Sequence, residues 1–536
     1  MTTRALFRFQ IAAALLLAAL FALPHGINAV REKPQALIRI VTTDDGHYHA
    51  RVKAALLGRY GEVGNGVTGG ETVAKSSAPA LVELLVGILF GWTGFHAPQV
   101  ILLLTVLLTP LVVFPLVRLL RLLPLPDAYA LFWGFLYILT FLGPLQKPVN
   151  MSLSLPFTIL ALLLLFKARK ERTFPWILGS GIVLGIAPHI YFWSYTYLWA
   201  FTFFFFVFQF FQPTSEEKKG SIRTLLLVAA VTIIVASPFF FHLITASRSD
   251  PNFSVTAFRS TLIHSRGVES PVRALLLFGL LISSTLLAWK RRQDSSWIFP
   301  LAAVFAAFTA MHQNLIHGFI LSFSSHYYPF VALSALLATA FAWELGKNSW
   351  LRIPITLIGT LFLLAGIWDY RSAWDIARGE YYVRDIQHLK PALTLLDDGK
   401  RETVLTDKVS AHMVTAWTDD DVVYTAYIKH LFIRNEEYAE RYCLSEFFEP
   451  SGPDFTWLGS EVVERKEPEK IAERAKFFEN VCAPILKDPS EALRRYNVSL
   501  ILWNERLRPN ARPTLPGIEI MEQGDGWSLW RFPVRE

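Results

Sequence analysis

Long apolar runs separated by short polar gaps dominate the first 370 residues of the chain. A transmembrane helix needs about 20 mostly apolar residues to cross the hydrocarbon core of a bilayer. Eleven runs approach or reach that length, so we predict eleven transmembrane helices. The runs lie at about residues 9–23, 98–120, 127–146, 151–166, 174–191, 193–212, 222–244, 272–289, 296–312, 327–345 and 350–370.

A shorter apolar piece, Pro79 to Gly94, precedes the second long run. As a helix it would reach roughly 24 Å, which is less than a hydrocarbon core of ~30 Å. We therefore predict an interfacial or re-entrant half-helix at this point. The first run, which follows Arg4 and Arg8, is either a transmembrane helix or a cleaved signal peptide. We favour the helix, because residues 27–29 form a poor cleavage sequence.

Basic residues collect in alternate gaps between the runs. Lys and Arg resist translocation and mark short cytoplasmic loops, and here their clusters all fall on one side, which predicts a cytoplasmic N-terminus. Residues 30–97, the loops 245–271 and 313–326, and the C-terminal part would then lie outside. We divide the chain into a first transmembrane helix (1–29), an external loop with the half-helix (30–97), a ten-span bundle (98–370) and an extracytoplasmic domain (371–536).

The last part of the chain, residues 371–536, has a different character. It carries 23 Lys and Arg against 29 Asp and Glu, whereas residues 1–370 carry 28 against 15. Short β-type runs begin at Thr403, Asp421, Val498 and Trp527. Helical patterns cover residues 434–448 and 467–480. Together these patterns predict a soluble domain of mixed α/β type.

Both cysteines of the chain, Cys443 and Cys482, lie in this domain. If the domain faces outward, a disulfide between them would close a loop of about 40 residues and stabilise the domain by about 3 to 4 kcal/mol. Two unrelated buried thiols are the alternative.

Composition excludes several classes of protein. Hydrophobic residues make up 53% of the 536 residues and charged residues 18%, which is too apolar for an ordinary soluble enzyme or a disordered chain. The net charge of +7 resides in loop anchors, so it is poor support for nucleic-acid binding. We find no Walker loop, Rossmann glycine fingerprint, zinc-ligand spacing or Gly-x-Ser-x-Gly elbow, which disfavours ATP-driven transport and hydrolysis.

Acidic, histidine and tyrosine residues cluster near the start of the first external loop. The cluster consists of Asp44, Asp45, His47, Tyr48, His49 and Arg51. Periodicity predicts a helix that begins at the two aspartates, which would lie at its positive end. One of them is enough for an N-cap, and the histidines would then be surface residues. The functional alternative is a general base, or a divalent-cation site with oxygen and nitrogen ligands.

This cluster resembles a motif of known enzymes. Residues 45–51, Asp-Gly-His-Tyr-His-Ala-Arg, are similar to the Asp-x-x-Tyr-His-x-Arg segment that follows the first transmembrane helix of oligosaccharyltransferase catalytic subunits, which are GT-C glycosyltransferases. The order of spans, loops and C-terminal domain is similar to that superfamily over nearly the whole chain. Residues 436–441 and 496–501 also resemble segments in the tails of bacterial GT-C proteins. The resemblance implies a GT-C-like fold, and it implies that Asp45, with Asp44 as its nearest rival, acts on an acceptor against a lipid-phosphate sugar donor.

One motif of the oligosaccharyltransferases is missing from the sequence. Their second acidic motif, of the Asp-x-Asp type, lies between the third and fourth spans, whereas residues 143–154 contain no carboxylate here. A Trp-Trp-Asp acceptor motif is missing as well. These departures put peptide glycosylation and an obligatory metal in doubt. A divalent cation lacks the support of an Asp-x-Asp motif, so we assign no cofactor. The sequence fits metal-independent lipid-sugar transferases better than it fits oligosaccharyltransferases.

Other polar residues are candidates for the substrate pocket, because polar groups at membrane depth are costly unless they face protein, water or ligand. They are Gln313, Asn314, His317, His326 and Tyr327, for which a hydrogen-bonded helix break is the alternative. Three arginines of the loop 245–271 suit a phosphate, or else anchor to lipid head groups; they are Arg248, Arg259 and Arg266. Glu83 on the half-helix is another candidate: its carboxylate either lines the substrate pocket or reaches out to the membrane interface.

The sequence thus predicts a glycosyltransferase, transferring a hexose or a pentose, in the cell (inner) membrane. Its expected donor is a polyprenyl phosphate or diphosphate sugar, and its acceptor is an extracytoplasmic lipid, glycan or protein. We also expect contacts with membrane lipids, and we expect no binding of nucleic acid. One rival is a secondary transporter or lipid flippase, although neither midplane charges nor inverted repeats are visible. Another is a non-catalytic envelope assembly protein, for which eleven spans are excessive.

Overall fold

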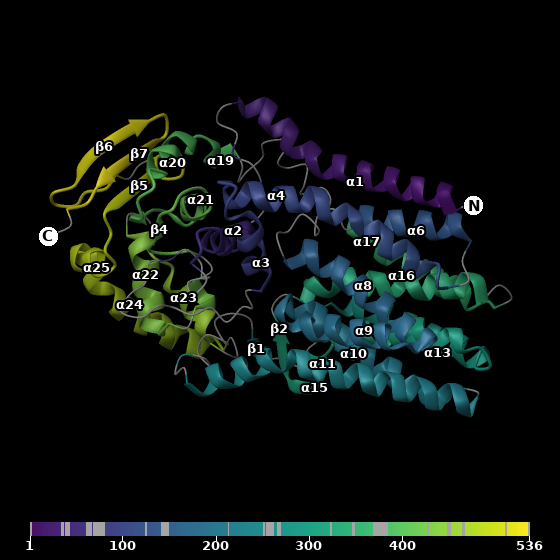
Figure 1. The fold of residues 1–536 in the computed structure, drawn as a ribbon. Helices are drawn as coiled ribbons and strands as arrows, with labels where there is room; N and C mark the ends of the chain where they lie inside the picture. Colours follow the sequence, from purple (N-terminus) through teal and green to yellow (C-terminus); the bar gives the residue numbers. More distant parts are fainter. Residues whose placement is uncertain are drawn as a thin grey trace. The chain divides into compact units, whose positions relative to one another are not determined.

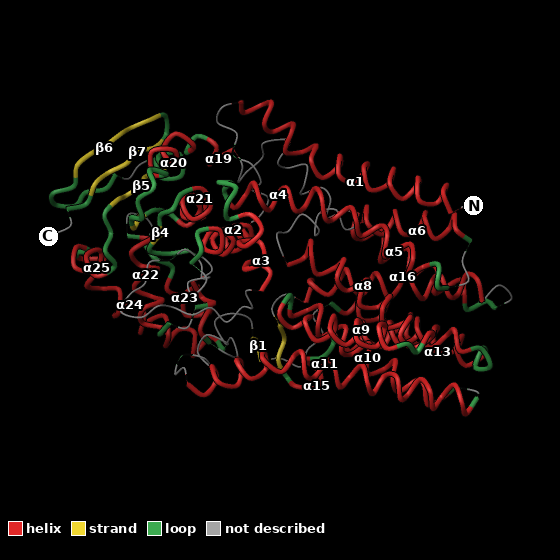
Figure 2. Tube along the Cα trace, viewed as in Figure 1, coloured by secondary structure: helices red, strands yellow, loops and turns green. Residues whose placement is uncertain are grey.

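The computed structural model describes two compact units of the chain, and each is treated by itself. The first comprises Met1–Ala22, Leu104–Ile244 and Ser265–Ala373, and the second comprises Leu23–Leu103, Thr245–His264 and Trp374–Glu536. Figure 1 shows the elements in chain order, and Figure 2 shows that the strands are few beside the helices. The described residues are 3–33, 37, 43–59, 67, 81–123, 126–140, 150–212, 214–249, 252, 262–264, 270–321, 324–345, 349–367, 384–425, 428–431, 433–447, 452–463, 467–509 and 512–533.

The described part of each of the eleven apolar runs is helical, so the predicted α-helical class is confirmed. The helices are α1 (Thr3–Glu32), α4 (Ala97–Leu108) with η3 (Thr109–Val112) and α5 (Val113–Leu120), α6 (Asp127–Thr140), α8 (Asn150–Glu171), α9 (Phe174–Ile186), α10 (Phe192–Phe208), α11 (Ser215–Ser249), α13 (Pro271–Lys290), α14 (Ile298–Met311), α16 (Tyr328–Leu345) and α17 (Arg352–Ile367). Short elements connect some of them: η4 (Ala187–His189), η5 (Gln209–Phe211), η6 (Ser295–Trp297), α15 (Asn314–His317), β2 (Phe319–Leu321) and η7 (Ser324–Tyr327).

Length and composition make several of these helices candidate membrane spans. Within the described part of the chain, five are long and apolar enough: Arg4–Glu32, Ala97–Leu120, Phe192–Phe211, Ser215–Thr245 and Pro271–Lys290. Shorter apolar helices lie at Leu81–Phe90, Phe174–His189, Ser295–Met311, Tyr328–Trp343 and Arg352–Leu364. The chain is therefore a polytopic helical membrane protein.

Polar side chains inside the first unit are satisfied by hydrogen bonds between helices. The hydroxyls of Tyr197 and Ser334 are 2.8 Å apart, and Tyr137 donates to the carbonyl oxygen of Pro329 at 2.7 Å. All three side chains with hydroxyls are fully buried. An unsatisfied polar group is costly in an apolar interior, so these bonds fix how α6 and α10 pack against α16.

Two glycines of α9 allow close packing against α11. A Cβ atom on Gly181 would lie 2.5 Å from Cβ of Val231, and one on Gly185 would lie 2.5 Å from Cβ of Val235. Small residues four apart on one helix face let two helix backbones approach closely in a membrane. The pair Gly181 and Gly185 therefore sets the distance between α9 and α11.

We expect the Gly181→Ala substitution to destabilise the first unit. The added methyl group would overlap Val231, and overpacking of this kind costs about 1–3 kcal/mol. Gly179→Ala is the matched control, because it lies on the same helix and its Cβ would meet nothing within 4 Å. Thermal unfolding in detergent should show a lower melting temperature for Gly181→Ala only; equal melting of both variants would contradict this account.

The second unit is built on a mixed five-stranded sheet with the strand order β4-β3-β5-β7-β6. Its strands are β3 (Thr403–Leu405), β4 (Asp421–Val422), β5 (Leu500–Asn504), β6 (Glu519–Gly524) and β7 (Trp527–Arg531). Strand β3 is parallel to both β4 and β5, whereas β7 is antiparallel to β5 and β6. The predicted mixed α/β character of this part is confirmed.

Helices cover both faces of the sheet. Leu405 and Ile501 belong to one apolar core, and Val404 and Leu500 belong to another, as expected when successive side chains of a strand point to opposite faces. Every residue of β5 is buried, which explains its continuous apolar sequence. The helices of this unit are α2 (Thr43–Leu56), α3 (Leu81–Phe90), α19 (Arg384–Gln387), α20 (Lys390–Leu396), α21 (Lys408–Trp417), η9 (Ile428–His430), α22 (Asn435–Glu446), α23 (Phe455–Val462), α24 (Pro468–Lys487) and α25 (Ser490–Arg495), and the unit also holds β1 (Leu262–His264).

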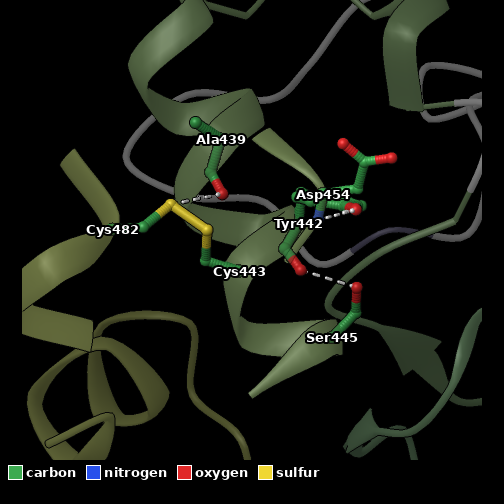
Figure 3. The surroundings of a disulfide bond; sticks show 6 residues. All are labelled: Ala439, Tyr442, Cys443, Ser445, Asp454 and Cys482. Atoms are coloured by element: carbon green, nitrogen blue, oxygen red, sulfur yellow. Dashed lines mark hydrogen bonds between the residues drawn. A yellow bond between two sulfur atoms is a disulfide. The ribbon is translucent and has the colours of Figure 1, made fainter. Parts of the chain in front are cut away.

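A disulfide joins Cys443 of α22 to Cys482 of α24, across 39 residues of sequence. Both cysteines are fully buried, and Sγ of Cys482 lies 3.6 Å from the carbonyl oxygen of Ala439 (Figure 3). The neighbouring Tyr442 accepts a hydrogen bond on its hydroxyl from the main-chain N–H of Asp454, at 3.1 Å. The disulfide and this bond together tie three helices of the domain to one another.

Candidate functional site

The acidic cluster lies at the start of helix α2. The helix begins at Thr43, so Asp44 and Asp45 fall in its first turn, as the periodicity predicts. Carboxylates are favoured at the positive end of a helix dipole. The side chains of residues 43–47 lie outside the described part of the structure, which includes the candidates Asp44, Asp45 and His47.

The second half of α2 is buried on every side. His49, Ala50, Val52 and Ala55 are fully buried, and Tyr48 is half-buried. The helix packs against α3 on one side and against α21 on another. A helix buried all round is fixed by its neighbours, so the acidic first turn projects from a rigid support.

Arg51 and Glu83, two of the predicted site residues, form a buried ion pair. Nε of Arg51 donates to Oε1 of Glu83 at 2.7 Å, and both side chains are 0% exposed. The other carboxylate oxygen of Glu83, Oε2, has no hydrogen-bond partner among the described residues. The pair joins α2 to α3, and each charge of the pair offsets part of the cost of burying the other.

Gly87 of α3, and Gly91 directly after it, allow this close contact with α2. A Cβ atom on Gly87 would lie 2.4 Å from the carbonyl oxygen of Ala55, and one on Gly91 would lie 2.9 Å from that of Leu56. The half-helix predicted from residue 79 to 94 is observed as α3, which ends before Gly91. Its inner face therefore has a partner in α2, whereas Ile88, on the same helix, is exposed.

Lys53 makes a contact that the sequence alone did not predict. Its Nζ donates to the main-chain carbonyl oxygen of Asp420 at 2.6 Å, and the side chain is buried. Asp420 lies in the loop between α21 and β4, and its Oδ1 accepts from the main-chain N–H of Glu402 at 2.8 Å. The only sequence signal of this contact is the run of three acids, 419–421, directly before a β-type run.

Burial shifts the pKa values of both partners of this contact. Burial lowers the pKa of Lys53 to about 8, against the raising effect of Asp421. Burial raises the pKa of the Asp420 carboxyl to about 7, although its bond from Glu402 acts in the opposite direction. Both groups therefore titrate near neutral pH, which is unusual for either residue type.

The raised pKa of Asp420 predicts a stability that depends on pH. Between about pH 4 and pH 7 the folded state binds this proton and the unfolded state does not, so the free energy of unfolding falls as pH rises through 7. The Asp420→Asn variant should lack this part of the dependence. Melting temperatures from pH 5 to pH 8 would test it, and parallel curves for wild type and variant would contradict it.

A second group of predicted residues is brought together in the first unit. Gln313 donates through Nε2 to the hydroxyl of Tyr327 at 2.7 Å, and that hydroxyl is also 2.7 Å from Oγ1 of Thr196. Tyr327 is 1% exposed. This side chain is therefore held in place by α10 and by the segment that follows α14.

His326 lies beside aromatic residues that precede α10 or begin it. Its Nδ1 is hydrogen-bonded to the hydroxyl of Tyr191, and its ring centroid is 4.5 Å from that of Trp193. The sequence did not single out Tyr191, Trp193 or Thr196, because aromatic and hydroxyl residues are ordinary members of an apolar run. Pairing with His326 and Tyr327 across more than 100 residues is what gives them a place in this group.

The remaining predicted residues lie in different surroundings. Asn314 is buried at the start of α15, and His317 is exposed at its end, where Gly318 has a φ of +84°. Arg248 is exposed near the end of α11. Arg259 and Arg266 lie outside the described residues. In the described part of the chain, no three His, Cys, Asp or Glu side chains are grouped so that they could hold a metal ion.

Comparisons with known proteins include a likeness of fold to solved structures. No family model matches the chain, and no curated protein matches it. Among solved structures, it is similar to the crystal structure of ArnT from Cupriavidus metallidurans bound to undecaprenyl phosphate, with a TM-score of 0.49 and 11% sequence identity. The similarity covers 99% of this chain and 98% of ArnT. Likeness at this level assigns neither an activity nor a ligand to this chain.

Proposed function

We propose that this chain is an integral-membrane glycosyltransferase of the GT-C type that transfers a sugar from a polyprenyl-phosphate or polyprenyl-diphosphate carrier to an extracytoplasmic acceptor. The observation that carries the proposal is the acidic pair Asp44 and Asp45 in the first turn of α2. The helix behind them is buried and held by neighbouring elements. Two carboxylates exceed what an N-cap needs, and the rigid support suits side chains that must meet a substrate in one geometry.

The proposed chemistry needs only a base and a placed donor. Asp45, or Asp44 in its place, takes the proton of an acceptor hydroxyl. The acceptor oxygen then bonds to the anomeric carbon of the sugar, and the bond from that carbon to the carrier phosphate breaks. The carrier leaves as polyprenyl phosphate or diphosphate with the bonding electrons. The protein supplies position and proton acceptance, and the donor brings its own leaving group.

Two features support an extracytoplasmic location of the reaction. The basic clusters in alternate gaps between the apolar runs favour a cytoplasmic N-terminus and an outer α2. The buried disulfide in the second unit, which also contains α2, is of a kind that persists in oxidising compartments. We therefore infer that the acidic turn and the C-terminal domain lie outside the membrane, where lipid-linked sugars are used after they have been flipped.

The polar group in the first unit supports a sugar or phosphate contact. Gln313, His326 and Tyr327 are joined to α10 and to the segment before it by hydrogen bonds and ring contacts. Amide, imidazole and phenol groups can donate to sugar hydroxyls and to phosphate oxygens.

Transfer assays with cell membranes that contain the protein test the proposal, because such membranes can also supply the acceptor. The donors are a panel of radiolabelled polyprenyl-phosphate hexoses and pentoses, and the same membranes without the protein are the control. We expect label to move from the lipid to a non-prenyl product with one of these donors. Counterflow of the lipid or solute without any transferred product would overturn the proposal in favour of a transporter.

A further inference from the structure

Lys53 links the acidic helix to the sheet of the second unit. Its bond to the carbonyl oxygen of Asp420, at 2.6 Å, joins segments that are 367 residues apart in the sequence. Asp420 is directly followed by β4, which pairs with β3. The contact therefore connects α2 to the sheet through a single loop residue.

Filling space does not by itself explain a lysine at this position. A methionine would cover the same apolar surface without the cost of removing an ammonium group from water. Lysine is among the residues least often buried, and here its side chain is 6% exposed. Compared with methionine, lysine supplies a charged hydrogen-bond donor for the carbonyl oxygen of Asp420.

The bond lies on a helix that is also held by α3. The other support consists of the Arg51–Glu83 ion pair and the close approach of Gly87 to Ala55. At a rise of about 1.5 Å per residue, Asp45 lies about 12 Å along the helix axis from Lys53. Helix α2 also packs against α21, but the Lys53 bond is its hydrogen bond to the loop that leads into β4. Without that bond the helix can shift relative to the sheet, and its first turn, about 12 Å away, moves the most.

We infer that Lys53 is a positioning residue for the acidic first turn of α2. Its hydrogen bond to Asp420 holds Asp44 and Asp45 in a fixed place relative to the C-terminal sheet. The inference rests on the proposed function, because it requires that the reaction use these carboxylates. The C-terminal domain is then a scaffold for the catalytic helix rather than a separate binding module.

Burial, together with the charged neighbours of Lys53, sets the pH range in which this hydrogen bond is strongest. Those facing its ammonium are Asp421, Arg59, Asp420 and Asp419, and it also acts on Asp397. Because burial lowers the pKa of Lys53 to about 8, the group loses its charge above that pH. A neutral amine is a weaker donor than an ammonium group. Positioning should therefore weaken in mildly alkaline solution.

Three variants of the full-length protein test the inference. Lys53→Met removes the donor and keeps the volume, whereas Lys53→Arg keeps a charged donor. Lys429→Met is the matched control, because the ion pair of Lys429 with Glu461 lies in the same unit but involves neither α2 nor the loop at Asp420. Hydrogen exchange of the peptide 43–57 reports the position of α2, and transfer from the most active donor of the panel reports the reaction.

For Lys53→Met we expect exchange of the α2 peptide to rise at least tenfold and kcat to fall about 10- to 100-fold with KM unchanged. Lys53→Arg should recover part of both, and Lys429→Met should change neither. The alkaline limb of kcat near pH 8 should be absent from Lys53→Met. Unchanged exchange in Lys53→Met, or a loss shared by Lys429→Met, would overturn the inference. If wild type transfers no sugar, the proposed function fails, and exchange alone then decides whether Lys53 holds α2.

Discussion

Replacing Asp45 by asparagine is expected to lower the rate of sugar transfer by about 100- to 10,000-fold, the range that a general base contributes. Asparagine has nearly the shape of aspartate but cannot accept the proton of an acceptor hydroxyl. It caps helices as well as aspartate does, so the start of α2 should persist. Transfer from the active lipid-linked donor, measured with equal amounts of folded protein, gives the result.

Asp44→Asn and Asp454→Asn complete this experiment. Asp454 is a plain N-cap, since its Oδ1 accepts from the main-chain N–H of Trp457 at 2.9 Å, and its substitution should leave transfer unchanged. A large loss in Asp44→Asn and none in Asp45→Asn would move the base by one residue. If neither substitution reduces transfer, the acidic pair is only a cap and the proposed mechanism is wrong.

Removing the carboxylate of Glu83 should be the most destabilising single change in the second unit. Glu83→Ala would remove the carboxylate that accepts from Nε of the buried Arg51, and breaking a buried ion pair costs about 3–5 kcal/mol. We expect a large fall in melting temperature. The double variant Arg51→Met/Glu83→Leu should recover most of it, because it removes both charges and keeps the volume.

An exposed ion pair of the same unit is the control for this prediction. Nη2 of Arg506 lies 2.8 Å from Oδ2 of Asp525, close to the 2.7 Å of the buried pair, but their side chains are 43% and 94% exposed. A pair of this kind contributes about 0–1 kcal/mol, so Asp525→Ala should leave the melting temperature nearly unchanged. A loss of transfer in Glu83→Ala with unchanged melting would instead indicate that Glu83 touches the substrate.

The sequence predicted helices and strands correctly where burial requires a run of apolar residues. Apolar runs located the membrane helices, and the strand β5 was visible because both of its faces are covered. Strand β6 was missed, since almost all of it is exposed and its sequence lacks the alternation of a half-buried strand. The run 98–120 is divided into α4, η3 and α5, with Pro110 in η3, because proline removes a backbone donor from the helix.

Contacts between distant segments could not be predicted in this way. Arg51 was singled out as a member of the acidic cluster, and Glu83 as an acid on an apolar segment, but nothing local indicated that they would pair. Lys53 was not singled out at all, and its partner lies 367 residues away. Such pairs depend on how whole helices pack, and a charged residue carries no mark of which distant segment will bury it. The contacts of Tyr191 and Thr196 with His326 and Tyr327 could not be predicted for the same reason.

The bond between Cys443 and Cys482 also governs how the protein can be produced. If dithiothreitol or a similar thiol in an extraction buffer reduced this disulfide, the covalent link between α22 and α24 would be lost. Hosts with an intact export pathway and thiol-free buffers should therefore give better folded preparations. A blocking reagent added at cell lysis would prevent the two sulfurs from exchanging with other proteins during purification.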